Sequence, residues 1–331
     1  MSLIIPNRHD YEDATIGRER IPIYEKKIEK LEEEIDPTTG EPSYPWRFEA
    51  LSGFFKQADP KTEDLKFNYI NQDFGATKPW HEIIDEIQKL NETANENECY
   101  KLLFLARHGQ GYHNVIVSKY GHHAWYSKWH ALGTDGDIVY APDPDLTELG
   151  VNQAKENHAA WKEQLAKGAP KSSKFYVSPL KRSCDTLRYT WEGLAPETFH
   201  PVIVEDLREI IGFHLCNKRS TKTQILERFG KYGYTTEPGF TEKDELYGDT
   251  EELFEDHCIR VNKFLQRLFN NNYDEKSGKT NPTLDQIIST TSHGGTIKCF
   301  LAVTGHRAFT VSTGGMIPIV VRGVRTKSSK I

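Results

Sequence analysis

The chain has 331 residues, of which 37% are hydrophobic, and its formal net charge at neutral pH is −6. This length suits one large domain or two ordinary ones. The negative balance offers no basic surface for general nucleic-acid binding, and no apolar run approaches the length of about 18 residues that a membrane span requires.

The five cysteines are widely scattered and include no C-x-x-C pair. An odd, dispersed set is typical of reduced thiols in a cytoplasmic or nuclear protein rather than of a disulfide framework or a zinc site. The first residues, MSLIIPNRHD, lack the basic and apolar regions of a signal peptide. We therefore expect a cytoplasmic location, with a nuclear one also open.

Residues 1–45 are predicted to form an N-terminal extension. The charge-dense stretch 23–35 carries apolar residues at helical spacing, and prolines and a glycine between 37 and 45 end any helix. We expect a peripheral helix packed by one narrow stripe, with a partner-binding helix as the less favoured alternative. Residues 46–100 are aromatic-rich and are expected to be irregular, apart from an amphipathic helix over 80–90.

From residue 101 onward, strand-like and helix-like runs alternate. The predicted strands are 101–106, 174–178, 201–204, 286–292 and 318–321. The predicted helices are 148–166, 180–194, 223–230, 250–270 and 295–303, and a polar loop is expected over 270–283. This alternation predicts an α/β three-layer sandwich, with a mostly parallel central sheet and helices on both faces.

Two phosphate-binding motifs are incomplete. The segment 277–280 reads Ser-Gly-Lys-Thr but has Tyr273 in place of the leading glycine of a P-loop, and Gly109-x-Gly111 lacks the third glycine of a dinucleotide fingerprint. A metal site is a further alternative, because five histidines crowd one region. These histidines are His108, His113, His122, His123 and His130. No Asp or Glu pattern completes a set of metal ligands among them, so we favour a functional site without metal.

Cationic and glycine residues follow three of the predicted strands, at the point where each strand ends. Ligands of parallel sheets bind beyond these carboxyl ends. Guanidinium forks bind phosphoryl oxygens, and a glycine-rich helix start presents backbone N–H groups to an anion. The sequence therefore predicts a phosphoryl site formed by Arg107, His108, Asn114, Arg182, His293 and Gly294.

These motifs resemble the histidine phosphatase superfamily, also called phosphoglycerate-mutase-like. The resemblance rests on Arg107-His108-Gly109 with Asn114, LTELGVNQA (146–154), SPLKRSCDT (178–186), DLREIIGFHLCNKR (206–219) and SHGG (292–295), in the family's order. KLLFLARHGQGYHNV and the aromatic stretch 44–74 resemble fungal phosphomutase-like proteins more closely still. The resemblance implies a phosphoglycerate-mutase-like fold, with a domain over 46–331 and a catalytic core over 101–325.

The resemblance also implies a phosphohistidine enzyme without metal or cofactor. His108 would attack phosphorus as a neutral imidazole. Arg107, Arg182 and a protonated His293 would hold the phosphoryl oxygens together with Asn114 and Gly294. Glu209 would be the general acid, with Asp206 as the alternative.

The segment 121–144 is expected to cover the pocket. Within it, Trp125 and Trp129 are expected mainly to pack, and His214 is a weaker candidate for substrate contact. We expect a metal-independent phosphatase for a small phosphomonoester, with neither nucleic acid nor membrane as partner. A phosphoglycerate-type mutase and a non-catalytic interaction module remain alternatives, and the substrate, pH optimum and oligomeric state are left open.

Overall fold

The computed structural model describes residues 2–37, 40–274, 277, 279–282 and 285–326. Within these residues, seven strands form one sheet in the order β1-β9-β2-β8-β3-β4-β5. The strands β2 (Glu98–Arg107), β8 (Ile287–Ser292), β3 (Lys174–Val177), β4 (Val202–Ile203) and β5 (Thr235–Thr236) are parallel to their neighbours. β9 (Met316–Arg325) runs antiparallel to both β2 and β1 (Trp46–Leu51). The mostly parallel sheet is confirmed.

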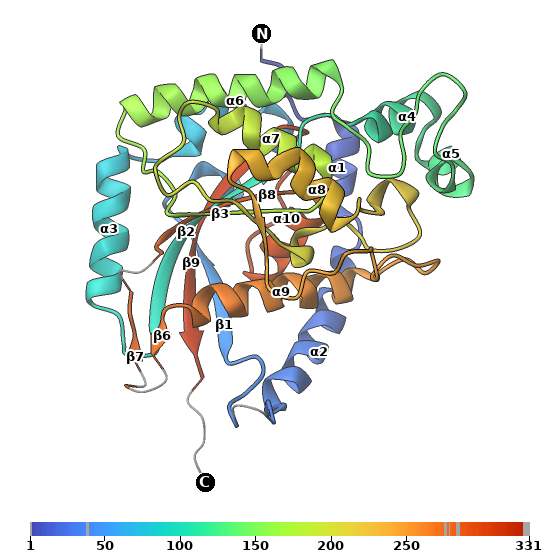
Figure 1. The fold of residues 1–331 in the computed structure, drawn as a ribbon. Coiled ribbons are helices and arrows are strands. Elements are labelled where there is room, and N and C mark those ends of the chain that lie inside the picture. Colours follow the sequence, from blue (N-terminus) through green and yellow to red (C-terminus); the bar gives the residue numbers. More distant parts are fainter. Residues whose placement is uncertain (1, 38–39, 275–276, 278, 283–284, 327–331) are drawn as a thin grey trace.

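Helices cover both faces of this sheet (Figure 1). The chain moves from β2 through α6 (Glu148–Ala166) to β3, and then through α7 (Lys181–Trp191) to β4. It returns in the opposite direction through α9 (Phe254–Asn270) to β8, and through α10 (Gly294–Val303) to β9. Because crossovers between parallel strands are right-handed, the two directions place α6 and α7 on one face of the sheet and α9 on the other. Accordingly α6 packs on α7, and α9 packs on α10.

Local sequence explains the central elements. Leu102 to Leu105 of β2 are fully buried, as expected for a parallel strand covered on both faces. Helix α6 begins where the Thr147 hydroxyl accepts a hydrogen bond from the Gly150 N–H, and it ends at Ala166 as predicted. The remaining helices of this region, α3 (Trp80–Glu92) and α8 (Lys222–Phe229), also lie close to their predicted ranges.

Three predictions about the edges of the fold were wrong. Residues 46–100 are not merely irregular, since β1 pairs with β9 and Phe54, Phe55 and Phe74 are buried in the core. The last strand is longer than the predicted 318–321, since it begins at Met316 and ends at Arg325. The predicted loop 270–283 contains a hairpin of β6 (Tyr273–Asp274) and β7 (Lys279–Thr280), while 275–276, 278 and 283 lie outside the described residues.

The N-terminal residues pack on the α/β domain. α1 (Arg8–Thr15) starts with a capping box between Asn7 and Asp10 and lies against α10. α2 (Ile21–Glu33) lies against α9, with Tyr24 as its buried residue. None of the described helices combines the length and the apolar character needed to cross a bilayer.

Candidate active site

The sheet register places the predicted site residues side by side. Arg107 at the end of β2 is paired with Ser292 at the end of β8, and Val177 at the end of β3 is paired with Thr291. The His108 N–H then donates to the Ser292 carbonyl at 3.0 Å. Three strand ends that are far apart in sequence therefore meet at one edge.

The surroundings of His108 favour a neutral imidazole whose lone pair lies on Nε2. Its Nδ1 lies 2.6 Å from the carbonyl oxygen of Gly109. A carbonyl can only accept, so Nδ1 carries the ring proton and Nε2 keeps the lone pair. Burial, followed by the charges of Arg182 and Arg107, holds the pKa of His108 well below its usual value. The Arg182 Nε–H donates to this lone pair at 3.3 Å.

Arg182 is fully buried at the start of α7, and its guanidinium is oriented by the loop that follows Glu209. Its two terminal nitrogens donate to the Cys216 carbonyl at 3.0 Å and to the Asn217 side chain at 2.9 Å. Neither partner was identified from sequence, because carbonyl and amide acceptors in a loop leave no motif. The two contacts fix the guanidinium beside the His108 ring.

His293 faces His108 across the site, with ring centroids 5.0 Å apart. Its Nε2 lies 2.7 Å from the Ser178 hydroxyl oxygen, and its buried Nδ1 has no hydrogen-bond partner among the described residues. Burial, Arg182 and His108 hold the pKa of His293 well below its usual value. These influences favour a neutral His293 over the protonated form that the resemblance implies. With Ser178 donating to Nε2, His293 presents a neutral Nδ1–H instead.

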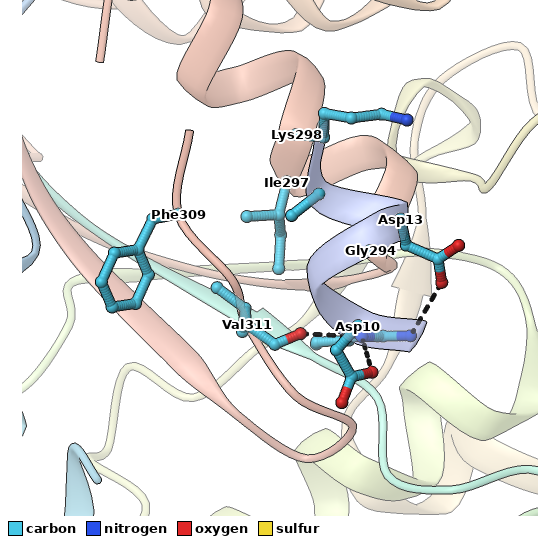
Figure 2. A pocket seen from close by; sticks show the side chains of 9 residues that line it. Asp10, Asp13, Gly294, Ile297, Lys298, Phe309 and Val311 are labelled. Atoms are coloured by element: carbon cyan, nitrogen blue, oxygen red, sulfur yellow. Dashed lines mark hydrogen bonds and ion pairs between the residues drawn. The ribbon is translucent and has the colours of Figure 1, made fainter. Parts of the chain in front are cut away.

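Arg107 is buried under an element that the sequence did not connect with the site. Its NH1 donates to Asp10 of α1 at 2.7 Å and to the Val311 carbonyl at 2.7 Å, and its NH2 lies 3.9 Å from Asp13. Asp10 and Asp13 point from α1 toward the same small cavity beside Gly294 (Figure 2). Burial opposes the charge of Arg107, but these carboxylates, with Glu209, more than offset it and raise its pKa. The Nε of Arg107 has no partner among the described residues.

Glu209 lies at the positive end of α10. Its carboxylate accepts hydrogen bonds from the backbone N–H of Ile210 at 3.1 Å and of Gly295 at 3.2 Å. A Cβ at Gly295 would lie 2.1 Å from the Glu209 Oε1, so only glycine leaves room for this carboxylate.

Arg260 of α9 fixes the backbone of this loop. It donates to the carbonyl oxygens of Asp206, Arg208 and Glu209. The alternative acid, Asp206, forms a 2.6 Å ion pair with Arg267. Asp206 does not line the larger cavity that contains His108 and Glu209. The structure therefore favours Glu209 over Asp206 as the carboxylate that faces the site.

Two glycines of the motifs let the first loop pass the start of α6. A Cβ at Gly109 would lie 2.4 Å from the Gly150 carbonyl oxygen, and one at Gly150 would lie 2.2 Å from that of Gln110. Asn114 of α4 (Tyr112–Tyr120) accepts from the Gly111 N–H at 2.9 Å and lines the cavity. The glycines of the two motifs, Gly109 and Gly150, therefore allow the two backbone segments to pack in direct contact.

A cavity of about 330 Å³ opens above His108. Trp125 of α5 (His122–Ser127) lines it and also packs in a small apolar cluster separate from the main core. Trp129 stacks on Tyr120, as expected for a packing role. His113 and His214 line the cavity with buried Nδ1 atoms that lack partners among the described residues. The sequence placed His113 only in the histidine crowd, because its spacing from His108 carries no geometry within a loop.

Comparison with known proteins agrees with this geometry. The sequence model of the histidine phosphatase superfamily (branch 1) matches residues 103–310, which contain every predicted site residue. The chain belongs to this superfamily. Asp10 and Asp13 of α1 precede the matched residues.

Relatives with curated names are fungal. The "Probable phosphoglycerate mutase" of Arthroderma benhamiae is 34% identical over 295 residues, covering 83% of this chain and 84% of the relative. "Phosphomutase-like protein 3" of Candida albicans is 36% identical over 279 residues, covering 83% and 80%. Among solved structures, the alpha-ribazole phosphatase of Shigella flexneri aligns with a TM-score of 0.39 at 18% identity, covering 69% of this chain and 96% of that one. The phosphoglycerate mutase of Bacillus anthracis aligns with a TM-score of 0.38 at 15% identity, covering 68% and 89%.

Proposed function

We propose that the protein is a metal-independent phosphatase that hydrolyses a small phosphomonoester through a phosphohistidine at His108. The observation that carries the proposal is that two side chains near the His108 ring each have a nitrogen without a hydrogen-bond partner. Arg107 Nε and His293 Nδ1 are both buried and have no acceptor among the described residues. A buried donor without an acceptor costs about 1–3 kcal/mol, and a phosphoryl group would supply the missing oxygens.

In the first step, Nε2 of His108 attacks phosphorus in line and forms an N–P bond while the ester P–O bond breaks. Before the attack, Arg182 releases the Nε2 lone pair and donates to a phosphoryl oxygen instead, while Arg107 and His293 hold the others. The leaving oxygen takes a proton from Glu209. In the second step, Glu209 accepts a proton from water, which attacks phosphorus and returns His108 to its starting form.

A mutase is the second candidate, and the name of the Arthroderma relative favours it. A mutase of the phosphoglycerate type needs a bisphosphorylated primer and a pocket that excludes water. Asp13 of α1 lines the same cavity as His108. Its carboxylate repels a ligand with several negative groups. This charge arrangement supports hydrolysis of a monoester over transfer from a bisphosphate.

A cytoplasmic or nuclear location is part of the proposal. All five cysteines are buried and free, which supports a reducing compartment. Cell fractionation with an antibody against the chain tests this part independently of activity.

The test of function uses the full chain and para-nitrophenyl phosphate. We expect turnover that vanadate inhibits, an acid-labile phosphoryl group on wild-type protein after rapid quenching, and loss of both in His108→Ala by about 10³-fold or more. His123→Ala, an exposed histidine that does not line the cavity, is the control. Activity of His108→Ala within tenfold of wild type overturns the assignment.

Two further assays address the alternatives. Isomerisation of a monophosphoglycerate that depends on bisphosphoglycerate, and that outpaces hydrolysis, would establish the mutase instead. Exhaustive chelation should leave the maximal rate within about threefold, because arginines and a histidine provide the charge stabilisation. A rate that collapses on chelation and returns with a divalent ion would refute metal-independent transfer.

A further inference from the structure

Three potential metal ligands meet where α1 approaches α5. His9 and Glu12 lie three residues apart on α1 and therefore share one face of that helix. His122 is the first residue of α5. The ligand atoms of these three side chains all lie within 4.8 Å of one another. The rings of His9 and His122 have centroids 5.0 Å apart.

A surface ion pair is the ordinary explanation for a histidine next to a glutamate, and His9 Nδ1 does lie 4.0 Å from a Glu12 oxygen. That explanation does not account for His122. Its Nε2 is buried and has no hydrogen-bond partner among the described residues, and one of its two ring nitrogens belongs to the three-residue cluster. A buried ring nitrogen without a partner is costly, and a bound cation would satisfy it.

The composition of the cluster suits one class of ion. Two imidazoles and a carboxylate are the ligand set that Zn²⁺ and similar divalent transition metals prefer. Zn–N and Zn–O bonds of about 2.0–2.2 Å would draw the ligand atoms to roughly 3.4 Å apart. His9 and Glu12 side chains are 53% and 42% exposed, so they have the rotational freedom to close this gap and solvent access for the ion to enter.

The cluster lies between two helices that both contribute to the lining of the active-site cavity. Glu12 and His122 both line the cavity above His108. α1 has only eight residues, too few for a stable isolated helix, so its position depends on its contacts. α5 belongs to the apolar cluster around Trp125, which is separate from the main core. An ion shared by the two helices would fasten two peripheral elements to each other.

We propose that His9, Glu12 and His122 form a binding site for a divalent transition ion of the zinc class, and that the ion links α1 to α5 beside the active-site cavity. The site is separate from the phosphoryl cradle, whose ligand is held by Arg182, Arg107 and His293. It also differs from the histidine crowd considered from sequence, of which it uses only His122. The ion therefore fixes the position of two helices that line the cavity and takes no part in phosphoryl transfer.

The test titrates the chelator-stripped full chain with Co²⁺, whose visible absorption intensifies in a four-coordinate site. We expect one intense site per chain, displaced by one equivalent of Zn²⁺. His9→Ala and His122→Ala should each weaken Co²⁺ binding by about tenfold or more, because a ligand is removed. The matched control is His81→Ala on α3, since His81 also lies 4.0 Å from a neighbouring glutamate, Glu82, but has no third ligand among the residues that the structure describes.

Hydrogen exchange gives a readout that does not depend on optical spectra or on activity. Zn²⁺ should slow exchange of the amides of α1 in wild type and in His81→Ala, and should have no such effect in His122→Ala. Circular dichroism checks that each variant folds. An unchanged Co²⁺ spectrum on addition of wild-type protein, or equal weakening in His81→Ala and His122→Ala, overturns the proposal. Because no step reads catalysis, failure here is distinguishable from failure of the proposed phosphatase activity.

Discussion

The ion pair between Asp10 and Arg107 should stabilise the fold as a coupled unit. Both side chains are almost fully buried, with 5% and 6% exposure. Removing one member of a buried pair leaves an uncompensated charge and costs about 3–5 kcal/mol. We expect Asp10→Asn to lose about 3 kcal/mol, the lower end of that range, because Val311 still accepts a hydrogen bond from the guanidinium. Arg107→Met should lower the free energy of unfolding by a similar amount, since it leaves the buried Asp10 carboxylate without its cationic partner.

The assay is a double-mutant cycle by urea denaturation, followed by tryptophan fluorescence. The loss of unfolding free energy in the double variant Asp10→Asn/Arg107→Met should be smaller than the sum of the two single losses by about 1–3 kcal/mol. The double variant leaves no buried charge without a partner. The matched control is Asp13→Asn on the same helix. Asp13 lies 3.9 Å from Arg107 and its side chain is 43% exposed, so its loss should stay below about 1 kcal/mol. Losses that add within about 0.5 kcal/mol would refute the coupling and would mean that α1 is held by its apolar contacts alone.

The remaining predictions concern the acid, its glycine and the buried histidines. Glu209→Gln should slow phosphorylation of the enzyme by an alkyl phosphate by about 10²–10⁴-fold, and by para-nitrophenyl phosphate far less, because nitrophenolate leaves without a proton; equal losses in single-turnover assays would assign Glu209 to positioning. Gly295→Ala should reproduce that leaving-group dependence, since its Cβ would meet the Glu209 carboxylate at 2.1 Å, whereas Gly230→Ala, with open space around its Cβ, should be neutral. The pKa of His108 is held well below 6.5, so single-turnover phosphorylation should keep its rate as the pH falls through 6.5; a half-maximal rate at that pH would contradict a neutral nucleophile. Folding lowers the pKa of His113 and His293 in the same direction, so the unfolded chain binds more protons below about pH 6.5. The free energy of unfolding should therefore fall between pH 7 and pH 5, and a rise over that range would contradict the burial of neutral rings.

The sequence by itself determined the regular elements of the catalytic core and the chemistry at the strand ends. Helix α6 could be predicted to its last residue, because its cap and its apolar spacing are local signals. Arg107, Arg182 and His293 could be placed at one sheet edge, because parallel strands end on the same side. The antiparallel β9 and the pairing of β1 could not, since strand direction and edge pairing depend on which segments meet in space.

Only the tertiary structure decided which groups surround the nucleophile. The contact of Asp10 with Arg107 spans 97 positions, and that of Arg260 with the Glu209 carbonyl spans 51. The signals that predict helices and strands from sequence are local: hydrophobic periodicity, capping residues and turn residues act within about one or two helical turns. They therefore cannot predict contacts between residues so far apart in the sequence. The lowered pKa of His293 also depends on packing, because it arises from burial and the charge of Arg182 rather than from the residue type. Strand-end position made these residues candidates, and long-range packing set their charges and their partners.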